Sequence, residues 1–285
     1  MKVSKFINLM NFTHEFLDYK IKNFYVDHLK NIVLITINSN NIPFIIYYNT
    51  RTTDRNFAPL NIEIVLDDLL FVQPIDQKNW LLICNYEKNN ALIMNNQGEI
   101  IKKFYVGEGI QDCQVDKFNN IWISYFDEGI FGDSIIGNNG IVAFDSQGQI
   151  LFTDYNVLIE KNNVPPIDDC YAMNVNEDEV WLYYYSEFPL VRMKNKKLLG
   201  YWPNVNLKEN GISNGFAIGK DEVLFGTNNK KLVLYSLSER TMQEIIPFGE
   251  QGKKIEFISY IGRGSFLYLQ TENDIYFINL LEFKK

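Results

Sequence analysis

A short apolar strand that follows a turn recurs six times along the chain, and this repeat restricts the fold more than any other feature of the sequence. The recurring strand occupies residues 31–37, 79–86, 120–126, 179–185, 222–227 and 265–271. Its equivalent central residues, separated by 48, 41, 59, 43 and 43 positions, are Val33, Leu81, Trp122, Trp181, Leu224 and Leu267. A period of this length is typical of repeat proteins in which each unit is one small sheet.

Each unit contains further strands around the recurring one. A second apolar strand follows it, as at 42–48, 90–94 and 140–145, another strand precedes it, and a more variable outer strand comes last. Six such units predict an all-β fold, a six-bladed β-propeller with four-stranded antiparallel blades, because radial closure hides the sheet edges. A β-sandwich or a pair of barrels is the alternative. We expect residues 1–285 to form a single propeller domain.

In this arrangement, strands from the two ends of the chain belong to the same blade. The last unit ends after its third strand, at 282–285, and residues 2–9 form a short alternating strand with no strand before it. We therefore expect the N-terminal strand to close the last blade. Composition agrees with an all-β chain, since 5 Ala stand against 34 Ile and 21 Phe, and helix formers are scarce beside β-branched and aromatic residues.

Charge and cysteine content limit the partners and the compartment. The net charge is −8, with only five Arg, which argues against a nucleic-acid partner because phosphate binding needs clustered Lys and Arg. No segment resembles a secretory signal or a membrane span, so we expect a monomer in the cytoplasm with no membrane association. Cys84, Cys113 and Cys170 are widely spaced and form no CxxC motif, which is typical of a reduced compartment.

A hairpin motif in the third unit carries a family resemblance. The segment VDKFNNIWISYFDEGIFG at 115–132 resembles the D-x-x-G-N-I-W hairpin of bacterial six-bladed propellers, including NHL-like and gluconolactonase-like ones. The longer string from Gly107 resembles uncharacterised bacterial propeller proteins. Asn119 stands where this hairpin usually has Gly, and Asn tolerates the left-handed conformation. The resemblance covers the whole chain as a fold, but propellers host unrelated activities.

The resemblance to gluconolactonase-like propellers implies a metal site. Those proteins hold one divalent ion at the axis with a Glu, an Asn and an Asp from separate blades, and the ion polarises a lactone or phosphoester. The segments GEG at 107–109 and SNGFAIG at 213–219 are similar to theirs, although Glu108 lies in the third unit of this chain. The metal ligands that the resemblance implies are Glu108, Asp169 and Asn214.

Repeat spacing indicates polar residues at one end of the inner strands. The positions about ten residues before the recurring centres, with small shifts in two units, are Asn23, Phe71, Asp112, Asp169, Asn214 and Glu256. Convergent oxygen ligands at a channel mouth suit Ca²⁺ or Mg²⁺, which adds Asp112 to the candidate metal ligands. The alternative is that these strand ends are simply polar and solvated. No other cofactor is predicted.

Three long loops form the second candidate site, because propeller specificity resides in loops. They span 127–140, 155–170 and 202–215, and the first combines three acidic residues and four Gly with Ile and Phe. The ligand-binding candidates are Asp127, Glu128, Asp133, Tyr155, Asp168 and Trp202. An aromatic and acidic cup suits a peptide, a glycan or a cationic ligand. The alternative is aromatic packing beneath the loops.

These observations predict a module that binds a protein, peptide or small-molecule ligand, rather than an enzyme. His14 and His28 are the only histidines, so a Ser-His-Asp or Cys-His arrangement would need one of them to reach the axis. The alternative function is a metal-dependent hydrolase of the lactonase kind, with the divalent ion at the channel mouth.

Overall fold

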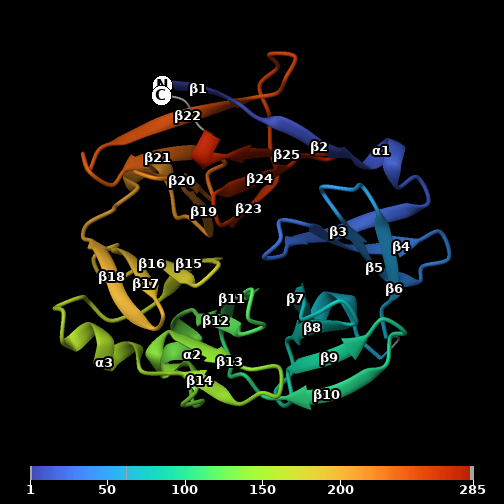
Figure 1. Cartoon of the computed structure of the whole chain (residues 1–285), viewed down its shortest axis with the longest axis horizontal. Coiled ribbons are helices and arrows are strands. Elements are labelled where there is room, and N and C mark those ends of the chain that lie inside the picture. The colour runs from blue at the N-terminus through green and yellow to red at the C-terminus, as the bar shows by residue number, and fades with distance from the viewer. Residues whose placement is uncertain (1, 62, 283–285) are drawn as a thin grey trace. The chain divides into compact units, whose positions relative to one another are not determined.

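The computed structural model describes residues 2–61 and 63–282. It contains six blades of four antiparallel strands, a β-propeller, which confirms the fold predicted from the repeat (Figure 1). The chain divides into two compact units. We call Phe16–Cys170 the middle unit, and Met1–Glu15 together with Tyr171–Lys285 the terminal unit. The prediction that residues 1–285 form a single domain stays a prediction, and the two units are described separately.

The middle unit contains three blades, each running from an inner to an outer strand. The first consists of β3 (Tyr19–Val26), β4 (Ile32–Asn38), β5 (Pro43–Tyr48) and β6 (Arg55–Pro59). The second consists of β7 (Leu69–Pro74), β8 (Asn79–Cys84), β9 (Ala91–Asn95) and β10 (Ile100–Phe104). The third consists of β11 (Ile110–Val115), β12 (Ile121–Tyr125), β13 (Ile141–Phe144) and β14 (Ile150–Phe152).

The recurring apolar strand is the second strand of its blade, and it is buried on both faces. Every residue of β12 is buried, as are the last five of β8. A strand covered on both faces reads as a continuous apolar run instead of an alternating one, which explains sequences such as IWISY. Between the first two blades, Val33, Leu82 and Met94 belong to one apolar cluster.

The terminal unit contains the other three blades. Its first consists of β15 (Cys170–Asn176), β16 (Glu179–Tyr184), β17 (Leu190–Lys194) and β18 (Lys197–Trp202). Its second consists of β19 (Gly215–Ile218), β20 (Glu222–Gly226), β21 (Leu232–Ser236) and β22 (Met242–Phe248). Its third consists of β23 (Ser259–Arg263), β24 (Phe266–Gln270), β25 (Asp274–Asn279) and the N-terminal strand β2 (Ile7–Asn11).

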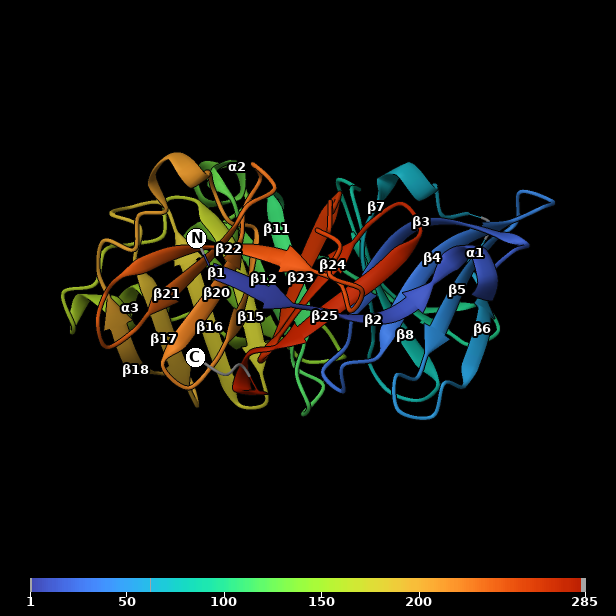
Figure 2. The same cartoon turned by 90° about the horizontal axis from the view of Figure 1, so that it is seen from above.

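The N-terminal segment is shared between two blades of the terminal unit. Strand β2 pairs antiparallel with β25 and so closes the last blade, as predicted. Strand β1 (Lys2–Lys5) instead pairs parallel with β22 of the preceding blade, as its fifth strand (Figure 2). Between them, Phe6 is fully buried, and its N–H donates to the carbonyl of Phe248 at 2.8 Å. The predicted closing strand is therefore two strands. Residues 283–285 of the predicted chain end lie outside the described residues.

The hairpin motif of the third unit forms a carboxylate-capped turn. Asp116 accepts hydrogen bonds from the backbone N–H of Asn120 at 2.9 Å and from the indole N–H of Trp122 at 3.0 Å. Asn119 has φ 64°, the left-handed conformation expected for it. The first blade repeats this turn, since Asp27 accepts the N–H of Asn31 at 2.8 Å. A buried carboxylate that satisfies turn N–H groups has a structural role, which accounts for the motif.

The described helices are short, in agreement with the shortage of Ala. They are α1 (Phe12–Glu15), α2 (Asp127–Phe131) and α3 (Tyr155–Glu160), together with the 3₁₀ turns η1 (Leu66–Asp68), η2 (Gly137–Asn139), η3 (Lys208–Asn210) and η4 (Leu280–Glu282). Within residues 2–61 and 63–282, no helix combines the length and the apolar character needed to cross a bilayer.

Candidate functional site

Glycines hold the acidic loop at 127–140 against the preceding loop in the middle unit. A Cβ at Gly129 would lie 2.3 Å from the carbonyl oxygen of Glu108, so only Gly fits this contact. The backbone N–H of Phe126 donates to the carbonyl of Gly109 at 2.9 Å, just before α2 begins. The two loops therefore touch through their backbones, which brings the side chains of Glu108 and α2 to one surface.

Four of the predicted site acids are exposed on this surface. Asp127 and Glu128 occupy the first turn of α2, and Asp133 follows the helix by two residues. Glu108 is exposed in the facing loop and accepts a hydrogen bond from the hydroxyl of Tyr105 at 2.9 Å. Among the described residues, no ion pair involves any of these four carboxylates. Their negative charge is therefore not neutralised by a neighbouring Lys or Arg.

Asp169 joins the same surface from the end of the loop at 155–170. Its partial burial, and then the negative charge of Asp127, raise its pKa from 3.8 to about 6. Both effects disfavour the charged form of a carboxyl group. The structure thus brings together Asp127, a predicted ligand-binding residue, and Asp169, a predicted metal ligand. Asp168 is half-buried beside Asp169, just before β15.

Two large apolar side chains lie in the same loop. Phe131 at the end of α2 is 71% exposed, and Ile135 is 81% exposed. Exposed apolar residues are ordinary when scattered, but they are informative when they lie together at a rigid loop. We call the set formed by Glu108, Asp127, Glu128, Phe131, Asp133, Ile135 and Asp169 the α2 surface.

Tyr155 does not contribute to an exposed site, which corrects its assignment as a ligand-binding residue. It is the first residue of α3 and is fully buried, and Ile159 one turn later is 4% exposed. Apolar anchors on one side of a short helix attach the loop to the blade beneath. The burial of this residue agrees with the alternative of aromatic packing under the loops.

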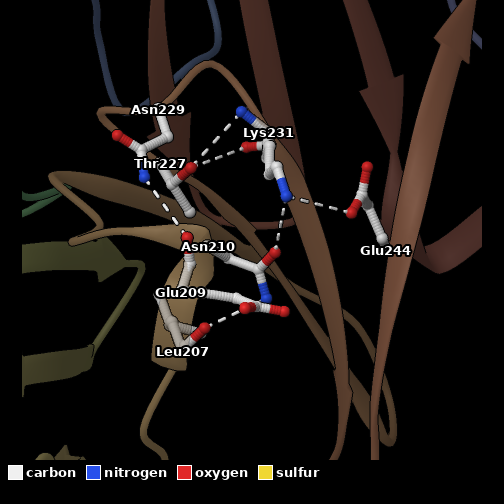
Figure 3. A network of polar contacts seen from close by, with 7 residues as sticks. All are labelled: Leu207, Glu209, Asn210, Thr227, Asn229, Lys231 and Glu244. Carbon is white, nitrogen blue, oxygen red and sulfur yellow. Dashed lines mark hydrogen bonds and ion pairs between the residues drawn. The ribbon is translucent and has the colours of Figure 1, made fainter.

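The third predicted loop, 202–215, is tied to the next blade of the terminal unit by polar contacts (Figure 3). The ammonium group of Lys231 donates to Oδ1 of Asn210 at 3.3 Å and pairs with Glu244 at 3.4 Å. The amide of Asn229 donates to the carbonyl of Glu209 at 3.4 Å. These contacts fix η3 against the β20–β21 hairpin and β22, so the loop is an ordered connection.

Trp202 precedes that loop and lies in a pocket of the terminal unit. Its ring stacks on that of Trp181, with centroids 5.4 Å apart and an interplanar angle of 12°. Arg192 lies over the Trp181 ring at 5.2 Å and binds Glu179 with two hydrogen bonds of 2.6 and 3.0 Å. The pocket that these four side chains help to line has a volume of about 540 Å³. Trp202 thus belongs to a different unit from the α2 surface.

The residues implied as metal ligands are Glu108, Asp112, Asp169 and Asn214. Within the described part of the chain, no three His, Cys, Asp or Glu side chains are grouped so that they could hold an ion. The carboxylate of Asp112 already accepts the N–H of Cys113 at 2.7 Å and the amide of Gln114 at 2.8 Å. Asn214 is exposed in the terminal unit, and its backbone N–H donates to the hydroxyl of Tyr260 at 3.2 Å. A metal role for these residues stays a prediction.

The cysteines are poorly placed for nucleophilic chemistry. Cys84, Cys113 and Cys170 are buried and form no disulfide with one another. Burial raises the pKa of the Cys84 thiol to about 11, and a thiol with a raised pKa is a weak nucleophile because the thiolate is the reactive form. The side chain of His14 lies outside what the structure describes.

Comparisons with known proteins identify a family match over part of the chain. The model of the YxzG family matches residues 141–278, slightly less than half of the sequence. No curated protein matches the chain. The match does not distinguish a gluconolactonase-like or NHL-like propeller from other propellers, so that assignment stays a prediction.

Several solved structures resemble the fold. The extracellular domain of the two-component system BT4673 from B. thetaiotaomicron has a TM-score of 0.51 at 11% identity, over 92% of this chain and 34% of that one. The extracellular domain of BT3049 from the same organism has a TM-score of 0.48 at 12% identity, over 96% and 40%. Apo AztD from Citrobacter koseri has a TM-score of 0.49 at 14% identity, over 90% and 69%.

These likenesses concern the fold, and they also correct one prediction. The chain spans only 34% of the BT4673 structure and 40% of the BT3049 structure, so the activities of those proteins do not transfer with the fold. The BT4673 structure is an extracellular domain, which contradicts the cytoplasmic location predicted from the sequence.

Proposed function

We propose that this propeller is a binding module whose α2 surface docks a protein segment with basic and apolar side chains. The observation that carries the proposal is the exposure of Phe131 and Ile135, at 71% and 81%, beside carboxylates that have no ion-pair partner in the described residues. Apolar side chains supply contact area, and the surrounding carboxylates select a cationic partner.

The backbone contact between Gly129 and Glu108 supports this proposal. Gly129 fits against the Glu108 carbonyl at a distance that excludes any side chain, so α2 packs directly against the backbone of the facing loop. A rigid surface loses little conformational entropy when a partner binds. The net charge of −8 adds a long-range attraction for a basic segment, and salt screens that attraction.

A synthetic peptide of alternating Lys and Leu tests the proposal by fluorescence anisotropy. We expect Phe131→Ala to weaken binding by roughly tenfold, and Glu128→Gln to weaken it several-fold at low salt and less at high salt. The matched control is Glu160→Gln, which removes an exposed carboxylate at the end of α3. This control should bind as the parent protein does.

The proposal fails if the Lys-Leu peptide binds no better than its Glu-Leu counterpart, or if Phe131→Ala and Glu128→Gln leave its affinity unchanged. Within the described residues, no three His, Cys, Asp or Glu side chains are grouped to hold an ion, and the hydrolase alternative stays a prediction. The exposed apolar and acidic side chains of the α2 surface support the binding function.

A further inference from the structure

A groove in the middle unit lies between the first and second blades and shares no residue with the α2 surface. Its volume is about 800 Å³, within the roughly 300–1,000 Å³ of typical small-molecule sites. One wall comes from β5 and β6 with the turn that joins them, and the other comes from β8 and the turn before it. The side chains that the argument uses are Asp27, Tyr47, Asn49, Asn56, Gln77 and Trp80.

Hydrogen bonds fix the floor of the groove. The hydroxyl of Tyr47 donates to Oδ2 of Asp27 at 2.6 Å and accepts the amide N–H of Asn31 at 2.5 Å. Asp27 and Asn31 are buried, at 1% and 3% exposure. The Tyr47 ring is therefore held in one orientation, with part of its surface open to the groove.

The second wall is equally fixed. The indole N–H of Trp80 donates to Oδ1 of Asn96 at 2.8 Å, and the amide of Asn96 donates to the carbonyl of Gln77 at 3.1 Å. Tyr47 meets Trp80 edge to face, with centroids 5.9 Å apart and an interplanar angle of 72°. Such an aromatic pair is a favourable arrangement. A ligand would thus meet walls that are already organised.

The polar groups at the opening carry unused hydrogen-bonding capacity. Asn56 on β6 and Gln77 in the β7–β8 turn are exposed, and their side-chain amides have no hydrogen-bond partner among the described residues. Oδ1 of Asn49 accepts the N–H groups of Arg51 and Thr52, at 3.0 and 3.2 Å, whereas its amide nitrogen has no such partner. An amide offers both a donor and an acceptor, as a hydroxyl group does.

The charge of the lining disfavours anionic ligands. Asp27 and Asp76 line the groove together with His28, and no Lys or Arg does so within residues 2–61 and 63–282. A phosphate or a carboxylate would meet like charge without a Lys or Arg to pair with. A neutral ring with several hydroxyl groups instead matches the amides, and its apolar face matches the open surface of Tyr47.

We propose that this groove binds a neutral saccharide, with one sugar ring against Tyr47 and hydroxyl groups on the amides of Asn49, Asn56 and Gln77. The equivalent register in the terminal unit has different chemistry, because Arg192 stands where β5 has Tyr47 and Gly200 where β6 has Asn56. The blade of β16, β17 and β18 therefore lacks the groups that would hold a saccharide in the blade of β4, β5 and β6.

Titration of the whole chain with maltose, cellobiose, lactose and N,N′-diacetylchitobiose tests the site. Calorimetry measures affinity, and saturation-transfer NMR reports contact between sugar and aromatic protons. We expect millimolar or tighter binding of at least one disaccharide, and Asn56→Ala to weaken it by roughly tenfold. The matched control Asn40→Ala removes an exposed amide from the β4–β5 turn of the same blade and should leave the affinity unchanged.

Three results would overturn the saccharide site. They are the absence of binding by all four sugars at millimolar concentration, equal affinity of the parent and Asn56→Ala proteins, and tighter binding of glucose 6-phosphate or choline than of every neutral sugar. The Glu128→Gln variant separates this site from the peptide surface. It should weaken the Lys-Leu peptide and leave sugar affinity as it is, so that either proposal can fail while the other survives.

Discussion

Trp202 lies flat against Trp181, with ring centroids 5.4 Å apart and planes 12° from parallel. The close approach depends on Gly200, because a Cβ there would lie 2.7 Å from the Trp202 ring. Trp202 follows Gly200 by two positions on β18, so both face the same side of the strand. Trp202, the last residue of the outer strand β18, thus covers Trp181 on the second strand of the same blade, β16.

Replacement of Trp202 by Ala should therefore destabilise the terminal unit, although Trp202 is only half-buried. We expect a loss of about 2 kcal/mol in the free energy of unfolding, from the lost apolar contact and the lost aromatic pair. Urea unfolding followed by circular dichroism measures it. Trp202→Phe should lose less than half as much stability as Trp202→Ala does. Gly200→Ala should lower the free energy of unfolding, because the added methyl group displaces the Trp202 ring. An Ala variant as stable as the parent would show that the stack contributes nothing.

The raised pKa of Asp169 predicts a dependence of stability on pH. Because the pKa is about 6 in the folded protein and 3.8 ordinarily, the native state binds more protons than the unfolded chain between these values. The free energy of unfolding then falls as pH rises through this interval. Asp169→Asn should be more stable than the parent at pH 7, by about 1 kcal/mol after discounting for solvent exposure.

Urea titrations at pH 7 and below about pH 3 test this prediction. The gain from Asp169→Asn should disappear below about pH 3, where the carboxyl group is protonated in both states. Asp133→Asn, an exposed change in the same surface, is the control and should have little effect at either pH. A gain that persists unchanged at the lower pH would contradict the assignment to Asp169 ionisation.

Removal of the contacts of Lys231 should open the loop at 202–215 locally without unfolding the whole protein. Lys231→Met keeps the aliphatic stem but removes the hydrogen bond to Asn210 and the pair with Glu244. Half-exposed ion pairs contribute little, so stability should fall by less than about 1 kcal/mol. Hydrogen exchange at 209–212 should accelerate nevertheless, because the loop loses its attachment. Lys253→Met, at an exposed lysine, is the control, and equal exchange in both variants would count against the role of this network.

Phe6 predicts that blade closure depends on one side chain. It is fully buried in a cluster with Leu232, Ile245 and Ile278, so Phe6→Ala should destabilise the protein by about 3–5 kcal/mol. Val3→Ala, on the same segment but 61% exposed, should change stability by less than about 0.5 kcal/mol. Thermal unfolding of the two variants gives the comparison. Similar effects of both would mean that the N-terminal segment adds stability only through its backbone.

Gly129 predicts a link between loop geometry and peptide binding. Gly129→Ala must push the Glu108 carbonyl away, because its Cβ would come within 2.3 Å. We expect a loss of about 1–3 kcal/mol in stability and weaker binding of the Lys-Leu peptide. Gly249→Ala provides the control, since its nearest neighbour would be 3.6 Å away. Unchanged stability and peptide affinity in Gly129→Ala would show that the loops do not need this contact.

The blades could be predicted from the sequence because strands buried on both faces leave long apolar runs such as those of β8 and β12. The turn at Asp116 was also predictable, since Asn119 at φ 64° is one of the few residue types that accept this conformation. The break at Phe6 was not. The alternation of apolar and polar residues along a strand shows which face of the sheet each side chain lies on. It does not show which strand is the neighbour, so a change of partner at Phe6 leaves no trace in the sequence.

The candidate site was only partly predictable for a related reason. Acids in Gly-rich loops indicated the α2 surface, and Asp127, Glu128 and Asp169 do lie there. The sequence does not show whether the ring of Tyr155 is exposed or buried, because Tyr occurs in both environments. The groove at Tyr47 was missed because its lining comes from turns and strand ends of two blades, which no single stretch of sequence reveals.

The division of the N-terminal segment between β22 and β25 has a consequence for synthesis on the ribosome. Residues 7–11 are translated long before their partner β25, which spans residues 274–279. The last blade cannot assemble until nearly all of the described chain has left the exit tunnel. Until then the edges of β1 and β2 remain open to wrong pairing, which makes the nascent chain a natural client for chaperones.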